Sequence, residues 1–226
     1  AGGFGMFCPS GLPLVYNIPH LSEKGKKKMK VVFNENGTLL ENAENFELAA
    51  TLDCGQAFRW ASSADGVWSG IAYGRELKLR QDGSNILLCG IGEKEFNGIW
   101  KNYFDLDRDY GAVIKAISTD RRLKAAAETG GGIRILRQEP WETLCSFIIS
   151  QNNNIPRIKG IISRLCALLG ENCGNGYTFP AAERLAACSP EDLVPLRAGF
   201  RTGYLLDAAE KVASGKIKLG ELTALP

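Results

Sequence analysis

The spacing of apolar residues changes near Gly92, and this change restricts the possible fold more than any other feature of the sequence. Before it, short β-prone runs follow one another, several with alternating polarity, as is typical of strands. After it, apolar residues recur at the three- and four-residue spacing of amphipathic helices. Strands first and helices afterwards predict an α+β fold.

The β-prone runs predict an antiparallel sheet. Asp65-Gly66 and Asp82-Gly83 separate successive runs, and Asp-Gly favours hairpin turns because such turns need positive φ. Strands are expected at residues 46–52, 57–62, 67–73, 76–81 and 85–91.

The helical region carries start and stop signals. Gly170 ends one apolar-periodic segment, and Ser189 followed by Pro190 is typical of an N-cap and first helical position. Helices are expected at residues 93–104, 108–118, 120–129, about 141–148, 158–169 and 204–214, with a short one after Ser189.

Composition excludes several classes of protein. The 226 residues are 45% hydrophobic, which suffices for a sizeable core, and the net charge of +2 does not by itself indicate a nucleic-acid partner. The sequence has neither an 18-residue apolar run nor a signal peptide, so an intracellular protein is expected, in the cytoplasm or nucleoid if it is bacterial. Seven scattered cysteines without a C-x-x-C pair and a single histidine, His20, argue against a disulfide framework and a metal centre. We expect no metal and no cofactor.

Residues 1–28 differ from the rest of the chain. They are rich in Gly and Pro and end in a basic run, so we expect a disordered or non-native extension, with Met29 as the natural first residue. The alternative is a nucleic-acid-binding arm formed by Lys24, Lys26, Lys27 and Lys28.

The stretch SQNNNIPRI, residues 150–158, places three amide side chains between two helices. Asn154 precedes Ile155-Pro156 and is suited to cap the second helix. That role does not account for Asn152 and Asn153, whose amides need partners or solvent. Amides at a helix junction can bind base edges of nucleic acid, and the guanidinium of Arg157 adds a bidentate cation.

Three stretches, LDCGQAFRW (52–60), RILRQEPWETLCSFIISQNNNIPRI (134–158) and RAGFRTGY (197–204), resemble in the same order those of the 8-oxoguanine DNA glycosylase family. The similarity runs from about Met29 to Pro226. It implies a TATA-binding-protein-like antiparallel domain, expected at residues 29–132, followed by part of a helical glycosylase domain at 133–226. It also implies a monomer that flips the damaged base out of double-stranded DNA containing 8-oxoguanine opposite cytosine.

The resemblance assigns roles to five residues. Gly55 would line the base pocket, where its carbonyl accepts a hydrogen bond from the N7-H that only oxidised guanine carries. Asn152 would fill the space left by the flipped base, and Arg157 and Arg201 would contact the orphaned cytosine. Phe200 stands where the family has an aromatic wedge, commonly tyrosine. The alternatives are a strand turn for Gly55, a core aromatic for Phe200 and a surface ion pair for Arg201, while Asn153 and Asn154 are expected to hold the loop.

The sequence departs from the family pattern at LTALP, where the helix-hairpin-helix would begin. In the family that segment supplies the catalytic lysine and aspartate, so we expect no catalytic residue in these 226 positions, no activity of the chain itself, and both glycosylase and AP lyase activity in a full-length protein. Lys159 and Lys211 are expected on solvated helix faces. The alternative function is a non-catalytic module that binds damaged DNA.

Overall fold

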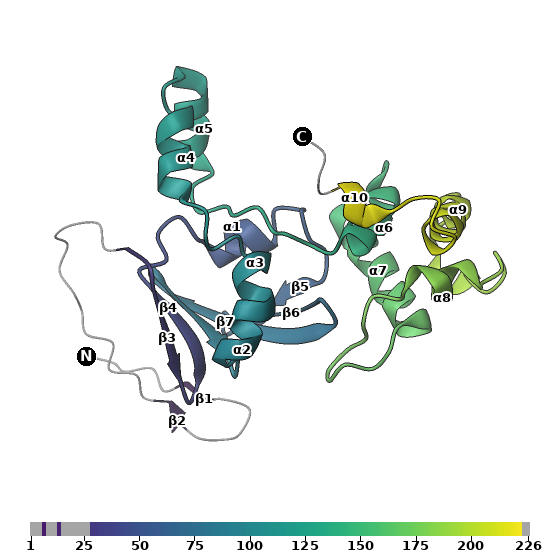
Figure 1. Ribbon diagram of the computed structural model, residues 1–226, viewed down its shortest axis with the longest axis horizontal. Coiled ribbons are helices and arrows are strands. Elements are labelled where there is room, and N and C mark those ends of the chain that lie inside the picture. The colour runs from purple at the N-terminus through teal and green to yellow at the C-terminus, as the bar shows by residue number, and fades with distance from the viewer. Residues whose placement is uncertain (1–5, 8–12, 15–27, 223–226) are drawn as a thin grey trace.

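The computed structural model describes residues 6–7, 13–14 and 28–222. One antiparallel sheet has the strand order β3-β4-β8-β7-β6-β5, with the helical part beside it (Figure 1). The strands are β3 (Lys30–Asn34), β4 (Gly37–Glu41), β5 (Trp60–Ser62), β6 (Trp68–Ala72), β7 (Arg75–Asp82) and β8 (Asn85–Cys89). The predicted α+β class and antiparallel sheet are confirmed.

Only part of the N-terminal extension can be compared with its prediction. Strands β1 (Met6–Phe7) and β2 (Pro13–Leu14) pair with each other and form a small separate sheet. Of the predicted disordered or non-native extension at 1–28, the structure describes residues 6–7, 13–14 and Lys28. The other lysines of the alternative basic arm lie outside the described residues.

The Asp-Gly turns lie where the sequence placed them. Asp82 is the last residue of β7 and pairs with Asn85 of β8, and Gly83 between them has φ 54°. Gly66, in the connection from β5 to β6, has φ 76°. Positive φ carries no steric penalty for glycine, which explains why these dipeptides close the hairpins.

The expected strand at 46–52 is wrong: Leu48–Leu52 form helix α1. Leu48, Thr51 and Leu52 are buried, and this i, i+3, i+4 pattern matches one face of a helix. The side-chain oxygen of Gln81 accepts the backbone N–H of Leu48, which has no partner within the helix. A short apolar run of this kind fits either element, and its tertiary contacts select the helix.

The other helices lie close to their expected positions. They are α2 (Glu93–Glu95), a π-helical turn (Phe96–Trp100), α3 (Lys101–Tyr103), α4 (Tyr110–Ile117), α5 (Arg121–Thr129), α6 (Pro140–Ser150), α7 (Ile155–Leu169), α8 (Ala182–Ala186), a 3-10 turn (Val194–Leu196), α9 (Arg201–Ala213) and α10 (Leu219–Leu222). Among these described helices, none is long and apolar enough to cross a membrane.

Two helix starts differ from expectation. Helix α9 begins at Arg201, before the expected Tyr204. After Ser189 the chain forms turns and the 3-10 turn instead of an α-helix, because Pro195 lacks an amide donor and disfavours the α conformation at Val194. Asp192 still accepts the backbone N–H of Ser189 at 2.8 Å and fixes this turn.

Two hydrophobic cores hold the chain together. In the first, aromatic side chains of the sheet and of residues 96–104 pack together, and Trp60 Nε1 donates to Tyr103 Oη at 2.8 Å. The second lies between α6, α7 and α9 and includes Cys145, Ile161 and Leu205. Helices α4 and α5 project away from both (Figure 1). The division at 132/133 stays a prediction.

A nearly buried ion pair joins the two cores. Arg59, next to β5, lies 3.3 Å from the carboxylate of Glu142 on α6, and their side chains are 9% and 13% exposed. The Arg59 guanidinium also donates to the carbonyl of Tyr177. Burial raises the pKa of Glu142 to about 7, although the Arg59 charge opposes the shift.

The raised pKa makes the junction sensitive to pH. The folded pKa of Glu142 exceeds the ordinary value of about 4.3, so burial favours the protonated carboxyl group over the carboxylate. The contribution of this protonated group to stability is complete below the ordinary value and is lost as pH rises through 7. Between pH 5 and 8, the free energy of unfolding of the parent should fall by about 2–3 kcal/mol relative to that of Glu142→Gln. Urea titrations at several pH values measure this difference, and parallel curves would contradict it.

Candidate nucleic-acid interface

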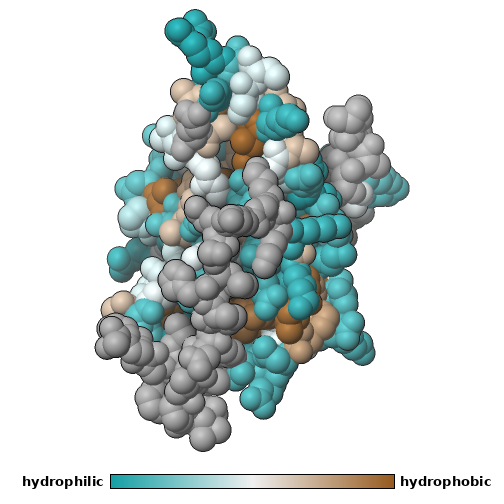
Figure 2. Space-filling model, turned by 90° about the vertical axis from the view of Figure 1, so that its left-hand side faces the viewer, coloured by the Kyte–Doolittle hydropathy of each residue, from teal (hydrophilic) through white to brown (hydrophobic). Residues whose placement is uncertain are grey.

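Exposed apolar side chains collect in the helical part and its approach. On the face shown in Figure 2, the coloured surface is mostly hydrophilic, and hydrophobic residues form small separate groups. The most exposed large hydrophobic side chains are Phe147 on α6, Phe200 and Tyr204 at the start of α9, Val194 in the 3-10 turn and Ile135 before α6. Single exposed hydrophobic residues are ordinary on protein surfaces, so the neighbouring pair Phe200 and Tyr204, whose rings are in contact, is the more informative feature.

The loop between α6 and α7 is held by its own amides. Asn153 Nδ2 donates to the carbonyl of Ile149 at 3.0 Å, and Asn153 Oδ1 accepts the N–H of Asn154 at 3.1 Å. Asn154 is the N-cap of α7, accepting the N–H of Arg157 at 3.0 Å. The expected cap and the local role of Asn153 are confirmed.

Asn152 and Arg157 keep their polar groups available. Asn152 is exposed with φ 48°, a left-handed conformation that asparagine tolerates better than most residues. Arg157 is exposed on the first turn of α7. Within the part of the chain that the structure describes, the Asn152 amide and the Arg157 guanidinium have no hydrogen-bond partner. They can therefore bind a ligand without first losing an internal bond.

Arg201 lies beneath this loop and is only 3% exposed. Its Nε and one terminal nitrogen donate to the carbonyl of Gln151, and that nitrogen also donates to the carbonyl of Asn152 at 2.9 Å. The other terminal nitrogen donates to the carbonyl of Ala198 at 3.3 Å. Four of the five guanidinium N–H groups are thus engaged. The alternative of a surface ion pair for Arg201 is wrong, because its partners are backbone carbonyls of a loop.

Phe200 is 63% exposed, so the alternative of a core aromatic is wrong. Its ring lies 4.4 Å from Arg201 Cζ and meets the Tyr204 ring edge-on at 6.1 Å between centroids. Cation–π and edge-to-face contacts of this kind restrict the ring orientation while leaving its outer face open. The tyrosine was not anticipated from the sequence, although its i+4 spacing from Phe200 was a usable signal.

Gly55 lies beside the start of α7. Its φ is 87°, and a Cβ built on it would meet Ile155 Cδ1 at 3.6 Å, so there is space but the conformation is strained for other residues. Asn152, Ile155 and Arg157 belong to one short segment, Arg201 binds that segment, and Phe200 packs on Arg201. The five predicted site residues therefore gather in one region, four near the surface and Arg201 under it.

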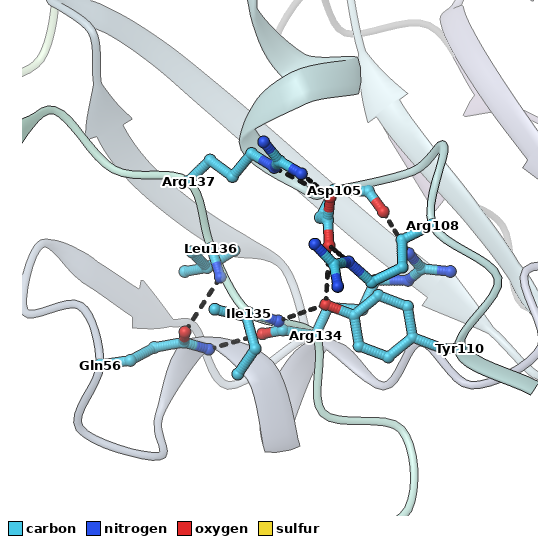
Figure 3. Close-up of polar contacts among 8 residues, drawn as sticks. All are labelled: Gln56, Asp105, Arg108, Tyr110, Arg134, Ile135, Leu136 and Arg137. Carbon is cyan, nitrogen blue, oxygen red and sulfur yellow. Dashed lines mark hydrogen bonds and ion pairs between the residues drawn. The ribbon is translucent and has the colours of Figure 1, made fainter. Parts of the chain in front are cut away.

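Gln56, which sequence reasoning missed, fixes the Gly55 loop (Figure 3). Its Nε2 donates to the carbonyls of Thr51 and Arg134, both at 2.8 Å, and its Oε1 accepts the N–H of Leu136 at 3.0 Å. Its own carbonyl accepts from Gln138 at 2.6 Å. A half-buried amide that meets so many backbone groups fixes the path of the chain on both sides.

Asp105 anchors the far side of the same network (Figure 3). It accepts Arg108 Nε at 2.7 Å, Arg137 Nε at 2.9 Å and the Tyr110 hydroxyl at 3.1 Å. Burial alone would raise the pKa of Asp105, but these hydrogen bonds, first of all from Arg137, hold it below its usual range. Arg134 adds a bond from its guanidinium to the Asp105 carbonyl at 2.8 Å. A charged anchor thus supports the segment that Gln56 binds.

Lys159 is not on a freely solvated face, which corrects the expectation. Its Nζ donates to Asp53 Oδ1 at 2.9 Å and to the carbonyl of Trp60 at 3.3 Å, and its side chain is 31% exposed. Lys211 is more exposed and pairs with Asp207 at 2.6 Å within α9. A cavity of about 740 Å³ lies elsewhere, at the start of α4, and none of the five predicted site residues lines it.

Within the described residues, the unpaired Asn152 amide and Arg157 guanidinium and the exposed Phe200 ring belong to the α+β fold as groups of the kinds that nucleic-acid-binding proteins use. The profile of the 8-oxoguanine DNA glycosylase N-terminal domain matches residues 38–144. N-glycosylase/DNA lyase of Saccharomyces cerevisiae is 34% identical over 204 residues, covering 80% of this chain and 53% of the yeast protein. N-glycosylase/DNA lyase OGG1 of Arabidopsis thaliana is 29% identical over 168 residues, covering 70% of this chain and 46% of the plant protein.

Solved structures agree. The 8-oxoguanine glycosylase/lyase of Clostridium acetobutylicum in its apo-form superposes with a TM-score of 0.82 at 37% identity, covering 88% of this chain and 70% of that one. The same enzyme in complex with double-stranded DNA containing cytosine opposite 8-oxoguanine gives a TM-score of 0.81. The chain belongs to the 8-oxoguanine DNA glycosylase family. It spans about half the length of the curated relatives it matches.

The burial of Arg201 leads to a stability prediction. Arg201→Met keeps the aliphatic volume but leaves the loop carbonyls without donors, so the free energy of unfolding should fall by about 3 kcal/mol. Arg197→Met, at an exposed position just before α9, should change it by less than about 0.5 kcal/mol. Denaturant titrations compare the two, and equal stabilities would show that the guanidinium does not hold the loop.

Proposed function

We propose that the protein is an 8-oxoguanine DNA N-glycosylase with associated AP lyase activity, acting in base-excision repair on lesions opposite cytosine. The observation that carries this proposal is the gathering of Gly55, Asn152, Arg157, Phe200 and Arg201 around the start of α7. Membership of the family supports the same activity. An intracellular, monomeric protein acting on double-stranded DNA fits this function.

The Gly55 carbonyl is the proposed acceptor for the lesion. Oxidised guanine carries an N7-H that guanine lacks, so guanine would leave a buried carbonyl unpaired at a cost of about 1–3 kcal/mol. The network of Gln56 and the segment 134–138 supports this assignment, because a single hydrogen bond discriminates only if its acceptor is fixed. Base flipping brings the lesion to such a pocket.

The loop residues are assigned to the gap in the duplex. Asn152 would enter the space of the flipped base, with its unpaired amide, and Arg157 would bind the orphaned cytosine through its free guanidinium. Phe200 would enter the stack as a wedge, which offsets part of the unstacking cost. Arg201 would contact the cytosine only with its one remaining N–H, and otherwise shapes the loop from below.

The lyase step needs a lysine nucleophile, which we do not assign to Lys159 or Lys211. Both donate to carboxylates, and activated lysines are instead desolvated or set beside another cation.

We propose that residues 29–132 and 133–226 act as a sheet domain and a helical domain that meet at this site. The alternative function is a non-catalytic module that binds damaged DNA. It would apply if the protein has no lysine nucleophile.

The activity has a direct test. The native gene product should release 8-oxoguanine from a duplex in which it faces cytosine, and borohydride should trap a covalent protein–DNA adduct, because reduction fixes the lysine imine. An undamaged duplex of the same sequence is the control. Lesion binding without base release or trapping would support the binding module instead, and equal behaviour toward both duplexes would reject both functions.

Asn152 and Asn153 should separate recognition from stability. Asn152→Gly removes an exposed amide and still adopts φ 48° without strain, so it should lower the preference for cytosine opposite the lesion about tenfold with no change in unfolding free energy beyond about 0.5 kcal/mol. Asn153→Ala loses its bond to Ile149 and should cost about 1 kcal/mol of stability. Cleavage kinetics on duplexes with each opposite base give the preference. An unchanged preference in Asn152→Gly would remove its assigned role.

A further inference from the structure

Helix α7 holds the Gly55 loop through two residues one turn apart. Ile155 and Lys159 lie on the same face of the helix. Ile155 faces Gly55, with its Cδ1 3.6 Å from the position of an added Cβ. Lys159 bonds to Asp53 on one side of Gly55 and to the carbonyl of Trp60 on the other, at 2.9 and 3.3 Å. One ammonium group therefore joins both arms of the loop to the helix.

The position of the Lys159–Asp53 ion pair matters more than its contribution to stability. The Lys159 side chain is 31% exposed and that of Asp53 is 57% exposed, and ion pairs with such exposure contribute little to global stability. Gln56 already fixes the loop to the segment after α5, but it makes no bond to α7. In the described part of the chain, the hydrogen bonds between α7 and the loop of residues 53–60 are those of Lys159.

We propose that Lys159 is a positioning residue that sets the Gly55 carbonyl relative to α7, and thereby the selectivity for 8-oxoguanine over guanine. This inference rests on the proposed function. The selectivity depends on one hydrogen bond, which weakens steeply when its length or angle leaves the usual range. Arg157 is on the same helix, so the pair also fixes the lesion acceptor relative to the residue assigned to the opposite base.

Two substitutions separate the hydrogen bonds of Lys159 from the negative charge of Asp53. Lys159→Met removes both hydrogen bonds and keeps most of the aliphatic stem in place. Asp53→Asn keeps an acceptor for the ammonium and removes the charge. Lys211→Met is the matched control, because Lys211 forms a comparable partly exposed ion pair with Asp207 within α9.

The experiment measures, for the native gene product and each variant, binding to three duplexes that carry 8-oxoguanine, guanine or a tetrahydrofuran abasic analogue opposite cytosine. Lys159→Met should lower the ratio of affinity for 8-oxoguanine over guanine about tenfold and leave affinity for the abasic analogue unchanged, since that duplex offers no base to Gly55. Asp53→Asn should lower the ratio about threefold. The double variant should be no worse than Lys159→Met, because both changes break one interaction. Lys211→Met should match the parent.

Each failure has a distinct signature. A parent that does not prefer 8-oxoguanine over guanine overturns the proposed function itself. A parent with that preference and a Lys159→Met variant with the same ratio overturns the positioning role, as does an equal loss of affinity for all three duplexes. If Lys159→Met does not fold, Asp53→Asn decides: a reduced ratio supports the role, and an unchanged ratio overturns it.

Discussion

The buried guanidinium of Arg201 is the interaction on which the proposed DNA surface depends. It joins the first turn of α9 to the carbonyls of Gln151 and Asn152 in the loop between α6 and α7. A buried arginine costs desolvation energy that only a full set of acceptors offsets, and here four of its five N–H groups are engaged. The backbone of Asn152 and the Phe200 ring are consequently held without a ligand, which is a form of preorganisation that favours the proposed DNA binding.

Hydrogen bonds between distant parts of the chain also connect the two cores. Gln56 binds the Gly55 loop to the segment 134–138, Asp105 supports that segment, and Lys159 ties the loop to α7. Each contact links a residue of the sheet part to one far along the chain. These long-range hydrogen bonds, together with apolar contacts such as that of Phe58 with the helical core, fix the two parts relative to each other at the proposed site.

Features set by neighbouring residues could be predicted from the sequence. The hairpin at Gly83, the end of α7 at Gly170 and the cap at Asn154 each depend on a few adjacent residues and were confirmed. The strand predicted at 46–52 is wrong, because an apolar stretch that short fits a strand or a helix equally well. Its helical form is selected by burial of Leu48 and Leu52 in a core that local pattern does not specify.

The site residues illustrate the same limit. The resemblance to the glycosylase family indicated Gly55, Asn152, Arg157, Phe200 and Arg201, but not that Arg201 is buried under its own loop. Its acceptors in that loop lie 50 and 49 positions away, and Asp53 lies 106 positions from Lys159. No periodicity or spacing rule connects residues so distant, so these contacts emerge only when the chain is folded.

A crystal structure of the native gene product with a duplex carrying 8-oxoguanine opposite cytosine tests the central claim most directly. The account predicts that the Arg201 guanidinium still binds the carbonyls of Gln151 and Asn152, with the Asn152 amide in the gap and the Gly55 carbonyl facing N7 of the lesion. A complex in which DNA lies on another face, or in which the α6–α7 loop has left Arg201 and refolded, would contradict it.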